Sequence, residues 1–251
     1  MVRVVPLNNY PSRCEDCLQS MDCPLISENG HVSSVANKTR VRVFHAGEYI
    51  YQAGENLEFM YRVRSGTAKT TIIRNDGSEQ VTGFYGPGEW LGVDAVVQEA
   101  HTGDAMALDT VSVCVIPLQP AIQHCTHSSH AIRSLMAIFS RRLVVNERLH
   151  MSLACDTANQ RLAQFLLFLS ASRVAVNLDG DDITLSMSRI DIASYLALAV
   201  ETVSRLFTQM QKNGLIRVHR NRVEILDREG LSSLAGGDIE IQKNRTVCKL
   251  K

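Results

Sequence analysis

The sequence predicts an α+β fold: a β-sandwich or β-barrel, then one long helix, then a C-terminal winged helix-turn-helix. Short β-rich runs alternate with turn residues between about residues 41 and 117, which is typical of antiparallel sheets. Residues 130–154 contain neither Gly nor Pro, so a single helix is expected there. The last third has the order helix, strand, helix, helix, hairpin, which predicts a winged helix-turn-helix.

The composition is that of an ordinary globular protein. Hydrophobic residues make up 45% of the 251 residues and charged residues 21%, which excludes global disorder and fibrous repeats. The 26 Lys and Arg residues balance the 26 Asp and Glu residues, so a histone-like polycation is excluded but a local basic patch is not. No apolar run approaches the ~18 residues of a membrane span. We therefore expect a cytoplasmic protein that does not contact a membrane.

Residues 1–29 form a polar segment with three cysteines, Cys14, Cys17 and Cys23. An iron–sulfur cluster or a zinc ion takes four thiolate ligands, and the best fourth candidate is Cys114, in the β-rich run of residues 111–116. We expect Cys114 at the edge of the sandwich, where a folded-over N-terminal segment can reach it. The alternative is a small buried apolar residue. The spacing leaves both iron–sulfur and zinc open.

Residues 30–128 make up the predicted β-domain, whose strands are expected at 49–51, 60–63, 69–73, 80–84 and 111–116. Near its end, His124, Cys125, His127 and His130 could bind a metal, but a polar connector is the favoured interpretation. The chain has seven cysteines, an odd number that favours reduced thiols or metal thiolates over a disulfide framework. Cys125, Cys155 and Cys248 have no partners at ligand spacing and are interpreted as incidental.

The long helix is predicted for residues 129–155. Its apolar residues recur mostly three or four positions apart, at Ile132, Leu135, Phe139, Leu143, Leu149 and Leu153. A helix of this length with one apolar stripe needs a partner. That partner is either the core of the same chain or a second copy, and we favour the dimer seam.

The DNA-binding domain is predicted for residues 156–235, and a basic, disordered tail for 236–251. A capping box at Thr157 opens its first helix. Ser188 caps a second helix, and Gly214 ends a third that begins at Val200. A hairpin with the tip Arg220-Asn221-Arg222 follows as the wing.

Basic residues are concentrated in this module. Residues 189–222 contain only two acidic residues, Asp191 and Glu201, against Arg189, Arg205, Lys212, Arg217, Arg220 and Arg222. Such a patch is typical of phosphate binding. Glu201, Ser204 and Arg205 share one face in the first turns of the last helix, the part that meets base edges. Glu201 can accept a hydrogen bond from cytosine, Ser204 can contact either donors or acceptors, and Arg205 can donate to guanine. The alternative is a surface ion pair between Glu201 and Arg205.

The order of these elements resembles the cyclic-AMP receptor superfamily of transcription regulators, most closely its FNR branch (fumarate and nitrate reduction regulators). The similarity spans about residues 47–236. It is carried by the segments Tyr61 to Gly66, Glu79 to Phe84, Gly92 to Ala95, Val113 to Pro117 and Val200 to Leu206.

The resemblance implies a β-roll of the cyclic-nucleotide-binding (jelly-roll) type, an oxygen-labile [4Fe–4S] cluster on Cys14, Cys17, Cys23 and Cys114, and a homodimer. It implies a palindromic DNA site of the type TTGAT-N4-ATCAA, read by Glu201, Ser204 and Arg205. Loss of the cluster would separate the long helices, along which Asn146 joins the seam. The DNA-bound dimer would recruit RNA polymerase, by analogy through the turn at residues 75–77.

Three positions depart from the pattern of that branch. The corner Ala197-Leu198-Ala199 lacks a hydroxyl cap for the last helix, which is worth about 1 kcal/mol. Asn146 stands where an acidic residue helps to keep subunits without the cluster apart. Asp22, beside the third cysteine, is charged where an apolar residue is expected, and it could make the cluster more labile.

Three other functions on the same fold remain open. A cyclic-nucleotide site requires a Gly-Glu pair for the ribose, which Gly88-Glu89 could supply. It also requires an Arg for the cyclic phosphate, and the sequence there has no Arg but has Asp104, which would repel a phosphate. A haem sensor could use His45 or His101, but it leaves the cysteines unexplained. A zinc-stabilised regulator would use the same four thiolates. We do not expect an enzyme, since there is no nucleophile–base pair, phosphate loop or HExxH motif.

Overall fold

The computed structural model describes residues 23–25, 33–175 and 178–236. Most of the predicted N-terminal segment and all of the predicted tail except Gly236 lie outside these residues. The chain divides into two compact units, residues 1–148 and 149–251, and each is described by itself. In the described part of the chain, no helix is long and apolar enough to cross a membrane.

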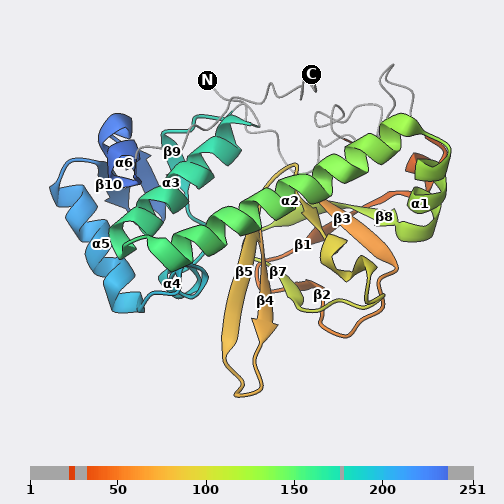
Figure 1. Ribbon diagram of the computed structural model, residues 1–251, viewed down its shortest axis with the longest axis horizontal. Coiled ribbons are helices and arrows are strands. Elements are labelled where there is room, and N and C mark those ends of the chain that lie inside the picture. Colours follow the sequence, from red (N-terminus) through yellow and green to blue (C-terminus); the bar gives the residue numbers. More distant parts are fainter. Residues whose placement is uncertain (1–22, 26–32, 176–177, 237–251) are drawn as a thin grey trace. The chain divides into compact units, whose positions relative to one another are not determined.

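The first unit is built on two four-stranded antiparallel sheets, with the orders β1-β8-β3-β6 and β2-β7-β4-β5 (Figure 1). This confirms the predicted β-roll. The strands are Arg40–Phe44 (β1), Tyr49–Tyr51 (β2), Phe59–Ser65 (β3), Ala68–Ile73 (β4), Glu79–Tyr85 (β5), Trp90–Leu91 (β6), Asp104–Ala107 (β7) and Val111–Pro117 (β8). Two short 3-10 helices, η4 (Ala36–Lys38) and η5 (Val93–Val96), complete the roll.

The sheet that contains β8 is covered on both faces. Val111, Val113 and Val115 point into the core between the two sheets. Cys114 and Ile116 alternate with them and belong to a second cluster on the outer face. Leu118 and Ala121 of α1 (Leu118–Thr126) and Ile138 of α2 (Ser129–Cys155) cover this outer face, together with Cys23, Leu25 and Val35. We call this second cluster the outer core.

Cys114 does not lie at the edge of the sandwich, so that expectation is wrong. β1 pairs with β8 along its whole length, from Arg40 opposite Val115 to Phe44 opposite Val111, and β3 pairs with its other side. β8 is therefore an interior strand. The side chain of Cys114 is accessible only from the outer face of the sheet, where it is half-buried.

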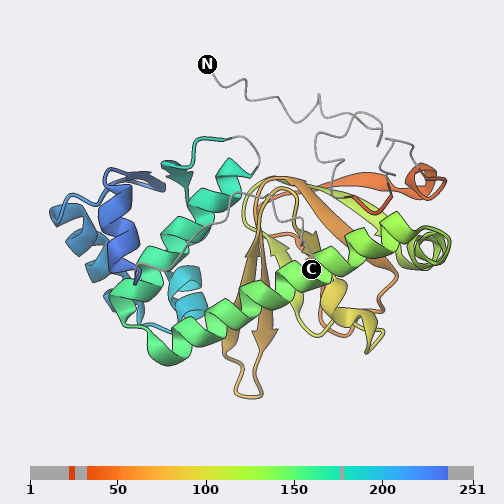
Figure 2. The same ribbon diagram turned by 45° about the horizontal axis from the view of Figure 1, so that its top comes forward.

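The second unit has the winged helix-turn-helix that the sequence predicts (Figures 1 and 2). Its helices are Ala158–Val174 (α3), Arg189–Leu196 (α4), Val200–Lys212 (α5) and Arg228–Leu234 (α6). Its strands Asp182–Thr184 (β9), Ile216–His219 (β10) and Arg222–Ile225 (β11) form a sheet in the order β10-β11-β9. Thr157 and Gln160 form the predicted capping box of α3.

Candidate DNA interface and thiol site

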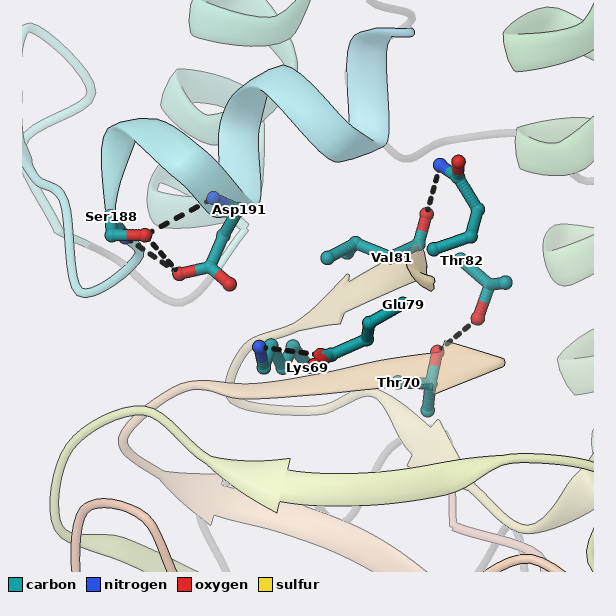
Figure 3. Close-up of polar contacts among 8 residues, drawn as sticks. Lys69, Thr70, Glu79, Val81, Thr82, Ser188 and Asp191 are labelled. Atoms are coloured by element: carbon teal, nitrogen blue, oxygen red, sulfur yellow. Dashed lines mark hydrogen bonds and ion pairs between the residues drawn. The ribbon is translucent and has the colours of Figure 1, made fainter. Parts of the chain in front are cut away.

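The start of α4 is fixed by a capping box between Ser188 and Asp191 (Figure 3). The backbone N–H of Asp191 donates to the Ser188 hydroxyl at 3.1 Å, and the backbone N–H of Ser188 donates to the Asp191 carboxylate at 2.9 Å. Arg189 follows, with its guanidinium carbon 3.6 Å from the centre of the Phe207 ring on α5. Burial lowers the pKa of Arg189. This predicted DNA-binding residue therefore also joins the two helices.

The corner between α4 and α5 has the weak cap that the sequence indicates. Ala199 has extended backbone and no side-chain hydrogen bond to the helix N-terminus. Ala197 adopts the left-handed conformation, with φ 51°, which is unfavourable for a residue with a Cβ. Arg161 of α3 supports this corner, because one of its guanidinium nitrogens donates to the Leu196 carbonyl at 3.1 Å.

The two faces of α5 separate as predicted. Val203, Leu206, Phe207 and Met210 are buried, whereas Glu201, Ser204 and Arg205 are exposed. The Ser204 hydroxyl donates to the Val200 carbonyl at 3.0 Å, one turn earlier. No ion pair between Glu201 and Arg205 occurs within this fully described helix, so the alternative role for these residues has no support.

The wing is less basic than its sequence indicates. Arg222 makes a two-nitrogen ion pair with Asp182 of β9, at 2.5 and 2.6 Å, and the hydrogen bonds and charge of Asp182 raise the pKa of Arg222. Arg217 pairs with Glu224 at 2.5 Å. Both carboxylates lie outside the window of residues 189–222, and only the pairing of β9 and β10 with β11 brings them close.

Three exposed cations of this unit lie on α5 or at the tip of the wing and form no ion pair within the described residues. Arg205 and Lys212 are exposed on α5 itself. Arg220 is exposed at the hairpin tip with a positive φ of 56°. Of the basic residues predicted to contact DNA, these three and Arg189 form no ion pair in the described chain, and Arg189 instead stacks on the Phe207 ring.

Two of the four predicted thiolate ligands lie within the described residues, and both belong to the outer core. Cys23 is buried there, and Cys114 packs against the same cluster. Neither forms a disulfide. Cys14 and Cys17 lie outside the described residues, as does Asp22. Within the described residues, no group of three or more His, Cys, Asp or Glu is arranged to hold a metal, and this includes the histidines around Cys125.

The exposed stripe of α2 differs in part from the predicted one. Ile132, Phe139 and Leu143 are exposed by 42%, 38% and 59%, and Met136, which stands beside them in the sequence, by 65%. Leu135 instead packs against the outer core of its own chain, where Ile138 is fully enclosed. Asn146 and Leu149 are half-buried. We use the name α2 stripe for Ile132, Met136, Phe139 and Leu143.

Three of the residues considered for other ligands, Asp104, Glu89 and His101, make side-chain contacts within the roll. The Asp104 carboxylate is not unpaired, since it accepts the Ala53 backbone N–H at 2.7 Å. The Glu89 carboxylate accepts the Gly86 N–H at 2.6 Å. His101 is buried and stacks on Tyr51 with 3.6 Å between ring centres, and burial lowers its pKa. His45 is exposed. An acidic, acceptor-only Asp104 still disfavours a bound phosphate.

Comparisons with known proteins agree with this architecture. The cyclic nucleotide-binding domain family matches residues 41–127, and the Crp-like helix-turn-helix domain family matches residues 160–234. FixK2 from Bradyrhizobium japonicum has a similar structure, with a TM-score of 0.72, 26% identity, and coverage of 78% of this chain and 96% of that chain.

Curated relatives extend over nearly the whole chain. Anr of Pseudomonas protegens, a transcriptional activator, is 37% identical over 231 residues, which cover 91% of this chain and 95% of that protein. The fumarate and nitrate reduction regulatory protein of Yersinia pestis is 31% identical over 238 residues, covering 94% and 95%. Proteins with these names are transcription regulators rather than enzymes. The chain therefore belongs to the FNR branch of the CRP/FNR family of helix-turn-helix transcription regulators.

Proposed function

We propose that the protein is a cytoplasmic, oxygen-responsive transcription regulator that binds a [4Fe–4S] cluster through Cys14, Cys17, Cys23 and Cys114. With the cluster bound, it forms a homodimer along α2, binds a palindromic site of the TTGAT-N4-ATCAA type and recruits RNA polymerase. The observation that carries this proposal is that Cys23 and Cys114 both contribute to the same buried cluster. Although distant in the sequence, both lie in or against the outer core, to which Ile138 of the helix with the exposed apolar stripe also belongs.

The described thiols suit a metal–thiolate group. They are not oxidised to a disulfide, and they come from a segment rich in cysteine and from a rigid interior strand. A [4Fe–4S] cluster would supply a group that oxygen degrades. Leu135 and Ile138 pack in the same outer core as Cys23. A change at the thiols therefore alters the packing under α2, and with it the α2 stripe on the opposite side of the helix.

The α2 stripe supports a dimeric active form. Four large apolar side chains stand exposed at steps of three and four residues along one helix, the spacing of a helix–helix seam. A second copy of the chain buries them. Two copies of α5 then read half-sites that lie one helical turn of DNA apart, which a monomer cannot span.

The residues that read DNA are those on the exposed face of α5. Arg205 can donate two hydrogen bonds to guanine, and Glu201 can accept one from cytosine. Lys212 and Arg220 contribute phosphate contacts, which favour binding without specifying sequence. Arg222 and Arg189 have weaker roles than the sequence indicates, because Asp182 and Phe207 engage them.

For polymerase, the exposed β4–β5 turn is the candidate surface, in which Asp76 accepts hydrogen bonds from Ser78.

The test is anaerobic purification followed by iron, sulfide and zinc analysis, an absorption spectrum and light scattering, repeated after exposure to air. We expect about four irons and four sulfides per chain, a brown dimer that binds the palindrome, and a colourless monomer after air exposure. Cys114→Ser should remove the iron. Cys155→Ser is the matched control, because Cys155 is an exposed thiol outside the predicted ligand set.

Two results would contradict the proposed cofactor. A colourless dimer with one zinc per chain that is stable in air would assign the cysteines a structural role and move the signal to another ligand. Equal iron contents in the Cys114→Ser and Cys155→Ser variants would exclude Cys114 as a ligand. Binding to the palindrome is measured separately on the same samples, so the DNA-binding part of the proposal is tested by itself.

A further inference from the structure

Arg62 is a buried cation that nothing described above explains. It lies on β3 with only 4% of its surface exposed. Its Nε donates to the Gly88 carbonyl at 3.4 Å, which is long for such a bond. Its Nη1 is buried and has no hydrogen-bond partner. Among the described residues, no carboxylate forms an ion pair with it.

The strand register places Arg62 directly beside Cys114. In the pairing of β3 with β8, Arg62 is opposite Cys114. In the pairing of β3 with β6, it is opposite Trp90. Directly opposite residues of antiparallel strands share a face, with their Cβ atoms about 4.5–5.5 Å apart. Cys114, Arg62 and Trp90 therefore form one row across the sheet, and both Cys114 and Trp90 belong to the outer core.

The aromatic ring in this row does not satisfy the guanidinium. The Arg62 guanidinium carbon is 5.6 Å from the centre of the Trp90 ring, close to the outer limit of about 6 Å for a cation–π contact. An Arg side chain cannot become neutral by losing its proton. A buried charge without a counter-charge is strongly unfavourable, so its retention in the outer core calls for an anion in that place.

A metal–thiolate group on Cys114 is such an anion. Four thiolates carry more negative charge than Zn²⁺ or the [4Fe–4S]²⁺ core carries positive charge, so either complex is anionic. Resting on the function proposed above, we propose that Arg62 is the electrostatic partner of the metal–thiolate group at Cys114 and points its unused N–H groups towards the sulfur. Arg62 is thus a positioning residue that stabilises the loaded form and raises its reduction potential, since reduction adds further negative charge.

The test compares Arg62→Met, Arg62→Lys and wild-type full-length protein, each with metal loaded anaerobically and each metal-free. We expect loading to raise the Tm of Arg62→Met by clearly less than it raises that of wild type. The metal-free Arg62→Met protein should be at least as stable as wild type, because an unpaired buried charge is gone. The midpoint potential of the loaded Arg62→Met protein should be lower, and Arg62→Lys should restore most of both effects.

The matched control is Arg42→Met, which removes the same charge from β1, the strand on the other side of β8. Arg42 is exposed, stacks on Phe44 at 4.7 Å and is opposite Val113 rather than Cys114. Its substitution should change the Tm equally with and without metal. If Arg62→Met behaves in the same way and leaves the midpoint potential unchanged, Arg62 is a structural residue and the inference is wrong.

The wild type alone reports on the proposed function. Zinc in place of iron would overturn the proposed cofactor, and the Tm comparison made with zinc would still decide the role of Arg62. A wild type that takes up neither metal would overturn both proposals, since the counter-charge assigned to Arg62 would not exist.

Discussion

The helices α2 and α5 are both amphipathic, but their exposed faces differ in chemistry. The exposed face of α5 is polar and includes Glu201, Ser204 and Arg205, whereas that of α2 has large apolar side chains such as Met136 and Leu143. A polar face is stable in water and suits the wet, charged surface of DNA. An apolar stripe is a cost in water until another surface covers it. The fold around α5 therefore needs no covering surface, whereas the α2 stripe is the face that we propose a second copy covers.

Leu143 gives the most direct test of whether the α2 stripe is a dimer seam, because it is 59% exposed on α2. Leu143→Glu should place like charges across the seam and leave a monomer, measured by light scattering at micromolar concentration. Because two linked sites bind more tightly than one by about 100-fold or more, affinity for the palindrome in a gel-shift assay should fall by about that factor. The thermal stability of the monomer should be almost unchanged, and a dimeric variant with full affinity would show that the seam lies elsewhere.

Ile138 lies on the opposite side of α2, and its substitution should reduce the stability of the single chain. It is 4% exposed in the outer core, so Ile138→Ala removes buried methyl groups and leaves a cavity. We expect a loss of about 2–4 kcal/mol in the free energy of unfolding, measured by urea denaturation. The corresponding change at the exposed Ile132 should cost less than about 1 kcal/mol in the monomer. Equal losses at the two positions would mean that the faces of α2 are assigned incorrectly.

On α5 the expected effect is on sequence choice rather than on folding. Arg205→Ala should cost about 1–3 kcal/mol of binding to the palindrome and relax selection at one base pair, measured by titrating sites that differ at each position. Lys212→Ala should weaken all sites alike and reduce the salt dependence of binding. Arg222→Ala should have a smaller effect than either, because Asp182 already neutralises Arg222. An Arg205→Ala protein with unchanged selectivity would refute the assignment.

The roll beneath α2 should also make stability depend on pH through Glu89. Burial raises the pKa of this carboxyl group from 4.5 to about 7, against the opposing effects of the Gly86 N–H and Arg142 of α2. The folded form therefore holds a proton that the unfolded form releases above about pH 4.5. The stabilisation from this group is full below that pH and is lost as the pH rises through 7.

Glu89→Gln keeps a neutral acceptor for the Gly86 N–H and cannot ionise. Relative to wild type, it should be more stable at pH 8 by about 1–3 kcal/mol and little different at pH 4.5. Urea unfolding of both metal-free proteins across this range gives the comparison. Parallel stability curves for the two proteins would assign the pH dependence to other groups.

The sequence predicts the fold well where a local pattern decides it. The β-rich runs, the turn residues between them and the capping boxes at Thr157 and Ser188 are all local signals, and the structure confirms the elements that they predict. Helices α1 and α6 were not expected. The sequence around His124 to His130 is interpreted as a polar connector, whereas the structure has α1 over Leu118–Thr126, with Leu118, Ala121 and Cys125 buried.

The candidate site is predicted less completely, because it depends on contacts between distant segments. Spacing alone identifies Glu201, Ser204 and Arg205, since i, i+3 and i+4 positions share a helix face. It does not identify the Asp182 partner of Arg222, the position of Leu135 in the outer core or the row of Cys114 and Arg62. Each of these follows from strand order or helix packing. The helical repeat of apolar residues shows that a long helix has an apolar face, but it does not show which residues of that face pack against the same chain.

The smallest effect is expected at the corner before α5, where Ala199 leaves the helix without a side-chain cap. Ala199 is exposed and already has the extended backbone of an N-cap residue, with φ −71° and ψ 146°. Ala199→Ser should therefore add a hydrogen bond to a free N–H and stabilise the unit by about 1 kcal/mol, measured by thermal unfolding. Ala199→Val, which has no hydroxyl, is the control. If both variants leave the Tm unchanged, water already satisfies the N–H groups at this end of the helix, and α5 needs no side-chain cap to hold its polar face in place.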